Sequence, residues 1–250
     1  MNHDVLTSRP VRRNAGVAPP SVSVIVPTYN EADNINLLID RLDVALAGSA
    51  YEVIVVDDDS VDETWRIVEE RAAENPRLMV IRRRNERGLS SAVLAGMAAA
   101  RGQTLVTIDA DLQHDESCIP DLVAAVTEDG VDLCLGSREA EGGGYGAWKR
   151  RRRLASWAGA TLARTALRVP VTDPMSGFFA ISRDRYEQVG PLVNPRGFKI
   201  MLEFLARGPK PAVAEVGYEF APRIHGTTKL SGRVVLDYLR ALASLFRARH

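Results

Sequence analysis

The stretch VSVIVPTYNEADNINLLIDRLDVALAGSAYEVIVVDDDS occupies residues 22–60 and sets the architecture. It begins with a β-branched run at residues 22–26, which stops at Pro27 and is typical of a strand buried on both faces. Apolar residues then recur at helical spacing over residues 34–47, and EVIVV at residues 52–56 is a second buried strand that enters an acidic loop. The stretch therefore predicts one β-α-β unit.

The alternation continues with a helix near residues 63–75, a strand at 78–81, a helix near 90–100 and a strand at 104–108. Such alternation predicts an α/β fold with a mostly parallel sheet that helices cover on both faces. In sheets of this kind, ligands bind beyond the carboxyl ends of the strands. The loops after Val26, Val56 and Ile108 should therefore line one crevice.

The length of 250 residues and the hydrophobic content of 46% suit one large domain, which we place at residues 21–232. Residues 1–20 are expected to be a disordered basic tail, because they lack the apolar stretch of a secretory signal. Residues 233–250 carry an apolar stripe at helical spacing and predict a C-terminal amphipathic helix, suited to core packing first and to membrane or partner docking second.

Charge and hydropathy narrow the classes of partner. Lys+Arg number 32 and Asp+Glu number 32, so no global field attracts nucleic acid, and we expect no nucleic-acid partner. The basic run KRRRR at residues 149–153 fits a solvated surface as well as a phosphate contact. No run approaches the roughly 18 apolar residues of a membrane-spanning helix. Any membrane contact should therefore be peripheral.

IDADLQHD at residues 108–115 is the sharpest chemical feature. Asp109 and Asp111 follow a predicted strand directly, and Gln113 comes two residues later. Alternate carboxylates at a strand end supply hard oxygen ligands, which suit Mg²⁺ or Mn²⁺ holding a diphosphate. The alternative is that these aspartates only cap a loop.

Two further loops carry polar groups at the same predicted edge. VVDDDSVDET at residues 55–64 leaves a buried strand, and Asp62 there fits an N-cap as well as a ligand. VPTYNE at residues 26–31 combines aromatic and carboxylate groups that suit a ribose and a base. Three weak signals that converge on one crevice favour a nucleotide-binding site.

Together these motifs resemble the family-2 glycosyltransferases, and within them most closely the dolichol-phosphate mannose synthases. The resemblance implies a single GT-A-type nucleotide-binding α/β domain. The resemblance covers about residues 23–232 and rests on the following segments in order: VPTYNEADNI, VVDDDSVDET, IDADLQH, LGSR, DPMSGFFAI, GFKIMLEFL and an R-x-x-G-x-x-K segment at residues 223–229.

The resemblance implies a role for each matching residue. The nucleoside ligands would be Pro27, Tyr29, Glu31, Val56 and Asp58. The ligands of the nucleotide sugar and metal would be Asp109, Ala110, Asp111 and Gln113. The phosphates would bind Arg138, Arg223 and Lys229, and the acceptor phosphate Arg152 and Ser156. Asp173 and Ser176 would shape the sugar and acceptor pocket. The catalytic set would be Asp111, Arg138, Arg223 and Lys229.

The implied activity is metal-dependent, inverting transfer of mannose from GDP-mannose to a polyprenyl phosphate. A phosphate acceptor needs no general base, because its second pKa of about 6 leaves it ionised at neutral pH. The chain contains no Q-x-x-R-W segment of the processive synthases, which argues against polymer synthesis. Two alternatives stay open: UDP-glucose as the donor, and a sugar-nucleotide-binding module without turnover.

The resemblance also implies a place in the cell. A lipid acceptor predicts peripheral association with a membrane, either directly or through an anchoring partner. The basic run beside an apolar helix at residues 154–167 fits contact with an anionic lipid carrier. The high alanine and arginine content favours a bacterial source, so the expected location is the cytoplasmic face of a bacterial membrane.

Overall fold

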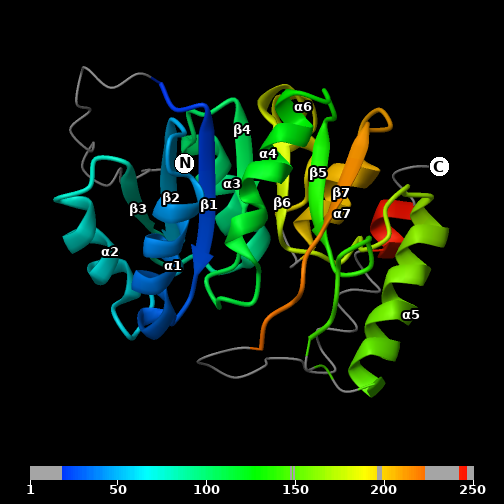
Figure 1. The fold of residues 1–250 in the computed structure, drawn as a ribbon, viewed down its shortest axis with the longest axis horizontal. Coiled ribbons are helices and arrows are strands. Elements are labelled where there is room, and N and C mark those ends of the chain that lie inside the picture. The colour runs from blue at the N-terminus through cyan, green and yellow to red at the C-terminus, as the bar shows by residue number, and fades with distance from the viewer. Residues whose placement is uncertain (1–18, 147, 149, 196–198, 223–241, 247–250) are drawn as a thin grey trace, which may run out of the picture.

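A computed structural model describes residues 19–146, 148, 150–195, 199–222 and 242–246. In this part of the chain a seven-stranded sheet has the order β3-β2-β1-β4-β6-β5-β7 (Figure 1). The strands are β1 (Val22–Thr28), β2 (Tyr51–Asp57), β3 (Leu78–Arg82), β4 (Thr104–Thr107), β5 (Leu133–Ser137), β6 (Phe179–Ser182) and β7 (Val213–Gly217). Only β6 runs antiparallel to its neighbours. The predicted α/β fold with a mostly parallel sheet is confirmed.

Helices cover both faces of the sheet. The α-helices are α1 (Ala32–Ala45), α2 (Thr64–Ala72), α3 (Leu89–Ala99), α4 (Ile119–Thr127), α5 (Arg150–Leu167), α6 (Arg183–Val189) and α7 (Ile200–Ala206); short 3₁₀ turns lie at η1 (Glu116–Cys118) and η2 (Gly190–Leu192). Along β1, Val24 and Val26 pack in the core formed with α1, α2 and α4, whereas Ile25 packs in the core formed with α3, α5, α6 and α7. β1 is mostly apolar because both of its faces are buried, and its buried Ser23 donates a hydrogen bond to Glu52.

The helix predicted over residues 34–47 begins and ends two residues earlier, as α1. The reason lies in a neighbouring loop, since Asp62 accepts a hydrogen bond from the Ala32 amide at 3.0 Å. Asp62 also accepts the Thr64 amide of α2 at 3.1 Å. The expected N-cap residue therefore stabilises the starts of two helices, and it satisfies amide groups that would otherwise lack partners.

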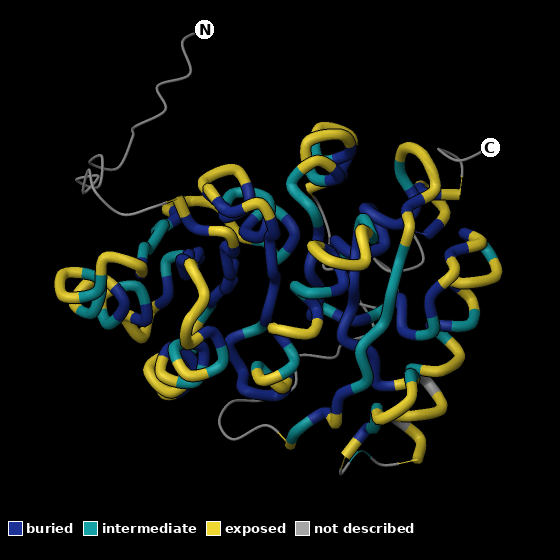
Figure 2. Tube along the Cα trace, turned by 45° about the horizontal axis from the view of Figure 1, so that its top comes forward, coloured by how far each residue is buried: buried dark blue, intermediate teal, exposed yellow. Residues whose placement is uncertain are grey.

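Burial follows the sheet, as Figure 2 shows: the strands are mostly buried, and exposed residues concentrate on loops and helix surfaces. Within the described residues, no helix has both the length and the apolar composition needed to cross a bilayer. Of the predicted C-terminal helix, residues 242–246 are helical, with Leu242 and Leu245 in the core. Residues 233–241 and 247–250 of the predicted helix, and residues 1–18 of the tail expected at residues 1–20, lie outside the described residues.

Candidate active site

Each of the loops after β1, β2 and β4 contains a non-glycine residue with left-handed backbone. These residues are Asn30 at φ 58°, Asp59 at φ 55° and Leu112 at φ 59°. Such backbone costs a bulky residue about 1–3 kcal/mol and persists only where the surroundings hold it, which is common at ligand sites. In this protein the left-handed residues lie in the three loops that the sequence predicts at one edge of the sheet.

The loops after β1 and β2 are tied to each other. The Asn30 amide donates to Ser60 Oγ at 2.9 Å, and Asn30 Oδ1 accepts the Val61 amide at 3.0 Å. Asp57 is fully buried and accepts from Thr28 Oγ1 and the Ser60 amide, each at 2.8 Å. The first aspartate of the DDD run therefore holds the two loops together.

The second aspartate of this run, Asp58, is buried beside Arg83, a residue just after β3. Arg83 Nε donates to Asp58 Oδ1 at 2.8 Å and Nη2 donates to the same oxygen. The Gly88 amide donates to Asp58 Oδ2 at 2.8 Å. An ionised carboxylate offers about four lone-pair sites, so Asp58 keeps capacity to accept hydroxyl or N–H groups of a nucleoside.

Pro27 and Val56 lie opposite each other in the register of β1 and β2. Their proximity agrees with a shared role at the nucleoside. The Val56 side chain is fully buried and packs against Gly96 of α3, however. Only the main chain of Val56 is therefore placed to meet a ligand at this edge.

Tyr29 and Glu31 flank the left-handed Asn30. The Tyr29 ring is partly exposed, and the guanidinium carbon of Arg87 lies 4.6 Å from its centroid. Glu31 Oε2 accepts a hydrogen bond from Asn34 Nδ2 at 2.7 Å. An aromatic face and a carboxylate thus stand together at the end of β1, as the nucleoside role requires.

The loop after β4 brings Asp109, Ala110, Asp111 and Gln113 together. Asp111 is buried, and its Oδ1 accepts the Gln113 amide at 3.3 Å. The Gln113 side chain donates from Nε2 to the Ala221 carbonyl at 3.1 Å. The side-chain oxygen of Gln113 is therefore the atom available to a cation.

The donor set fits a hard divalent cation. Asp109 and Asp111 supply carboxylate oxygens, which Mg²⁺ and Mn²⁺ prefer, and Gln113 can add an amide oxygen. Across the described residues, no cluster of three or more His, Cys, Asp or Glu side chains is arranged to hold a metal alone. Remaining positions around a cation would fall to water and to a bound diphosphate, as is usual for Mg²⁺.

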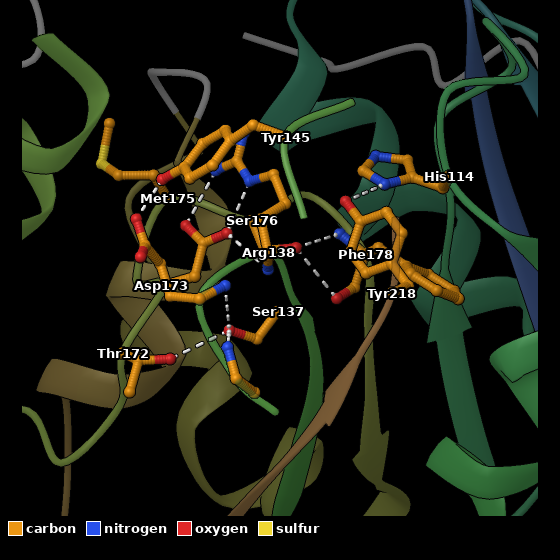
Figure 3. A network of polar contacts seen from close by, with 12 residues as sticks. His114, Ser137, Arg138, Tyr145, Thr172, Asp173, Met175, Ser176, Phe178 and Tyr218 are labelled. Atoms are coloured by element: carbon orange, nitrogen blue, oxygen red, sulfur yellow. Dashed lines mark hydrogen bonds and ion pairs between the residues drawn. The ribbon is translucent and has the colours of Figure 1, made fainter. Parts of the chain in front are cut away.

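Arg138, after β5, forms a buried ion pair with Asp173, as Figure 3 shows. Nε lies 2.6 Å from Oδ2 and Nη2 lies 2.8 Å from Oδ1. Aromatic rings surround the guanidinium, with centroids 5.3–5.5 Å from its central carbon: Tyr145, Trp148 and Phe220. Within the described residues, Nη1 has no hydrogen-bond partner, and it is the nitrogen that could reach a phosphate.

Hydrogen bonds from neighbouring strands hold the turn that contains Asp173. Thr172 Oγ1 bonds to Ser137 Oγ at 2.9 Å and donates to Glu215 Oε1 at 2.8 Å. Ser176 is buried, and its Oγ accepts the Phe178 amide at 3.1 Å. The two residues of this turn that the sequence assigns to the pocket, Asp173 and Ser176, are thus held by contacts from β5, from β7 and from Phe178, which precedes β6.

Tyr145 connects this pair to α5. Its hydroxyl donates to Glu139 and also hydrogen bonds with Ser156, one of the expected acceptor-phosphate ligands. Burial, and next the Glu139 contact, raise the pKa of Tyr145 to about 12, so the phenol stays neutral. Arg153 lies over the same ring at 5.3 Å. The side chain of Arg152, the other expected ligand, lies outside the described residues.

Arg223 and Lys229 also lie outside the described residues. The segment that leads to them is fixed, since the Ala221 amide donates to the Gln113 carbonyl at 2.9 Å. Together with the bond from the Gln113 side chain, this pairs residues 220–222 with the loop after β4. Arg223 thus follows in sequence directly after a segment bound to the candidate metal loop.

A sequence profile described as "Glycosyl transferase family 2" matches residues 23–190, which include all three loops and the Arg138–Asp173 pair. The chain belongs to glycosyl transferase family 2. It is 43% identical over 228 residues to a dolichol-phosphate mannosyltransferase of Pyrococcus furiosus, a match that covers 90% of this chain and 64% of the relative. It therefore spans less than two thirds of that protein.

Another relative of this family 2 glycosyltransferase is the dolichol-phosphate mannosyltransferase of Saccharomyces cerevisiae, 40% identical over 90% of this chain and 86% of the relative. Among solved structures, glucosyl-3-phosphoglycerate synthase of Mycobacterium tuberculosis, in complex with Mn²⁺, UDP-glucose and phosphoglyceric acid, has a TM-score of 0.69. It shares 23% identity, over 92% of this chain and 79% of that one. This second likeness concerns the fold.

The glycosyltransferase site contains a cation that the motif analysis did not assign. Lys199, at the start of α7, donates from Nζ to the Met175 carbonyl at 2.8 Å. Burial, and next the positive charge of Arg138, lower the pKa of Lys199 to about 8, while Asp109 and Asp173 oppose this shift. From sequence, no role was assigned to Lys199 or to Arg83, because a single basic residue has no spacing pattern that indicates a function.

Proposed function

We propose that this glycosyltransferase moves mannose from GDP-mannose to the phosphate of a polyprenol and inverts the anomeric centre. One observation carries the proposal: two relatives named dolichol-phosphate mannosyltransferases match 90% of the chain at 43% and 40% identity. The family profile covers residues 23–190 and so includes the loops after β1, β2 and β4. The geometry agrees, since these loops meet where an α/β sheet binds its ligand.

The donor would lie along the loops after β1, β2 and β4. The guanosine falls to Tyr29, Glu31 and Asp58, with the main chain of Pro27 and Val56 as a floor. Asp58 can accept ribose hydroxyls while Arg83 fixes its orientation. A buried carboxylate that is already paired needs little reorganisation when a ligand binds, which favours affinity.

The diphosphate would lie at the loop after β4. Asp109, Asp111 and Gln113 would hold Mg²⁺ or Mn²⁺, which when bound offsets the negative charge that the leaving diphosphate gains. The M. tuberculosis enzyme of the same fold was crystallised with Mn²⁺. Arg223 and Lys229, which follow in sequence after Ala221, a hydrogen-bond partner of Gln113, would add positive charge to the same phosphates.

The acceptor would bring its own nucleophile. A phosphate oxygen, already ionised near pH 7, would form a bond to C1 of mannose as the bond from C1 to the GDP β-phosphate breaks. GDP leaves with the electron pair, and attack from the opposite face converts the α-linked donor into a β-linked product. The protein then has to orient the acceptor, a task we assign to Arg138 Nη1, Arg152 and Ser156.

We assign membrane contact to the outer face of α5. Leu154, Trp157 and Leu162 are exposed by 65%, 54% and 47%, at spacings that place them along one stripe. Arg150 and Arg151 precede them on the same face and are exposed, and the helix contains no acidic residue. An apolar stripe with a cationic end suits the surface of an anionic bilayer.

The test is a transfer assay with two donors in parallel. Purified protein is incubated with Mn²⁺, undecaprenyl phosphate and radiolabelled GDP-mannose or UDP-glucose, and label is counted in the organic phase. We expect label from GDP-mannose, its loss in Asp111→Ala, and its retention in Asp121→Ala, which alters an exposed aspartate of α4.

Other outcomes separate the alternatives. Label from UDP-glucose alone would assign the chain as a polyprenyl-phosphate glucosyltransferase. GDP binding without transfer from either donor would favour a non-catalytic sugar-nucleotide module. If GDP binds without transfer, the assay is repeated with an added membrane fraction. Transfer restored by the membrane fraction would indicate a missing anchoring partner, and continued absence of transfer would indicate a lack of turnover.

A further inference from the structure

His114 belongs to the candidate metal loop after β4 and follows Gln113 directly in sequence. Its side chain is 5% exposed and lies among aromatic rings, with centroid distances of 5.3 Å to Phe178, 5.5 Å to Tyr218 and 5.6 Å to Phe220. The imidazole nonetheless has polar partners at both nitrogens. Nδ1 lies 2.7 Å from the Tyr218 hydroxyl, and Nε2 lies 3.3 Å from Asp109 Oδ2 (Figure 3 shows the Tyr218 side).

The direction of these hydrogen bonds follows from what each group can donate. An ionised carboxylate only accepts, so Nε2 must carry the hydrogen that bonds to Asp109. In a neutral imidazole Nδ1 is then bare and accepts from the Tyr218 hydroxyl. Burial raises the pKa of Tyr218 above its ordinary value, so the phenol keeps the proton that it donates.

We propose that His114 is a positioning residue that holds the Asp109 carboxylate in the orientation needed to bind a divalent cation, and that Tyr218 fixes the imidazole tautomer. The inference rests on the metal site of the proposed function and names residues that support it. The Asp109 side chain is 35% exposed, and the hydrogen bond from Nε2 limits the orientations that its carboxylate can adopt. Partners behind metal ligands typically contribute about 10-fold to 100-fold in metal affinity.

The hydrogen bonds from Tyr218 to His114 and from His114 to Asp109 connect distant parts of the chain. His114 follows β4 and Tyr218 follows β7, and 104 residues separate the two in sequence. The Tyr218 segment continues to Ala221, which pairs with Gln113. The segment after β7 therefore determines the geometry of the metal loop through a side chain as well as through the backbone.

The experiment measures Mn²⁺ affinity directly, by electron paramagnetic resonance of free Mn²⁺ in the presence of GDP. His114→Phe keeps a ring among the aromatic neighbours but removes the N–H donor, and we expect Mn²⁺ to bind about tenfold more weakly. His114→Gln returns an N–H group near the position of Nε2, and should recover most of that loss. Tyr218→Phe should weaken binding by a few-fold, because the tautomer is no longer fixed.

The outcomes are separable. Equal Mn²⁺ affinity in the wild type and in His114→Phe would overturn the inference and leave the metal site of the proposed function standing. A wild type that binds no Mn²⁺ with GDP would overturn both, with Asp111→Ala as the reference for lost binding. If circular dichroism shows that His114→Phe does not fold, Tyr218→Phe decides, and unchanged affinity there overturns the inference.

Discussion

Arg138 and Asp173 form a bidentate ion pair, with Nε 2.6 Å from Oδ2 and Nη2 2.8 Å from Oδ1. The pair joins the end of β5 to the turn before β6, and both side chains are buried. Burial alone would lower the pKa of Arg138, but the hydrogen bonds and charge of Asp173 raise it above its ordinary value. The site therefore contains a cation that stays charged and keeps one orientation.

Removing the Asp173 charge should destabilise the protein. In Asp173→Asn the guanidinium stays buried without its counter-charge, and we expect the free energy of unfolding to fall by about 3 kcal/mol. Urea denaturation measures the change. The matched control is Asp40→Asn, which breaks an exposed pair with Arg71 and should cost less than about 1 kcal/mol. Equal losses in the two variants would contradict the role assigned to burial.

Asp58 and Asp59 are neighbours in one run, yet we expect only the first to affect nucleotide binding. Asp58 is buried at the proposed nucleoside site, whereas the Asp59 side chain is 41% exposed and pairs with Arg82. A hydrogen bond to a charged group contributes about 1.5–3 kcal/mol, so Asp58→Asn should weaken GDP binding about tenfold or more. Calorimetric titration measures this, and Asp59→Asn should bind GDP like the wild type.

The apolar stripe on α5 predicts binding to anionic vesicles. Burying a leucine side chain contributes about 1.5–3 kcal/mol, so Leu154→Gln should lower the affinity for phosphatidylglycerol vesicles about tenfold or more in co-sedimentation. Leu192→Gln, which alters a leucine of η2 exposed by 51%, is the matched control. Binding that ignores Leu154 but falls with Leu192 would place the membrane at another face.

Lys199 predicts a dependence of stability on pH. Its pKa is about 8 in the folded protein against an ordinary value of 10.5, so between these values the unfolded chain binds more protons. The free energy of unfolding should therefore rise with pH across this interval. Lys199→Met removes the group, so the wild type should gain stability relative to this variant between pH 7.5 and pH 9.5. Urea denaturation at both values measures the gain.

The control for that experiment is Lys210→Met, which replaces an exposed lysine after α7. It should track the wild type at both pH values. A wild type and a Lys199→Met variant that change in parallel would show that Lys199 titrates in the folded protein as it does in water. Titration of buried tyrosines stays outside the chosen interval, since burial raises the pKa of Tyr145 to about 12.

The first half of the fold could be predicted from periodicity because each local pattern there is typical of either a buried strand or an amphipathic helix. Buried parallel strands are apolar on both faces, and the strands β1 to β4 and helices α1 to α3 were all expected within a few residues. The second half was not predicted in the same detail. β6 lies between β4 and β5 and runs antiparallel to both. No local sequence pattern predicts this position or this direction.

The candidate site divides in the same way. The DDD run and the D-x-D loop could be placed at one edge from sequence, since parallel strands that alternate with helices all end at that edge. How the three aspartates of the run differ follows only from their neighbours. Asp57 accepts a hydrogen bond from Thr28, whereas Asp58 pairs with Arg83 at the end of the neighbouring strand β3. Those partners are set by strand order and by the direction of each side chain.

The amino-acid pattern alone was enough for the fold class, the family resemblance and the ligand-bearing loops, because these depend on local periodicity and on short motifs. The pairing of Arg138 with Asp173, the burial of Lys199 and the contact between His114 and Tyr218 came from packing. The two contacts join residues that lie 35 and 104 positions apart in sequence. The pKa of Lys199 depends on how much water the neighbouring elements exclude. Distances and desolvation of this kind arise only once the whole sheet has formed.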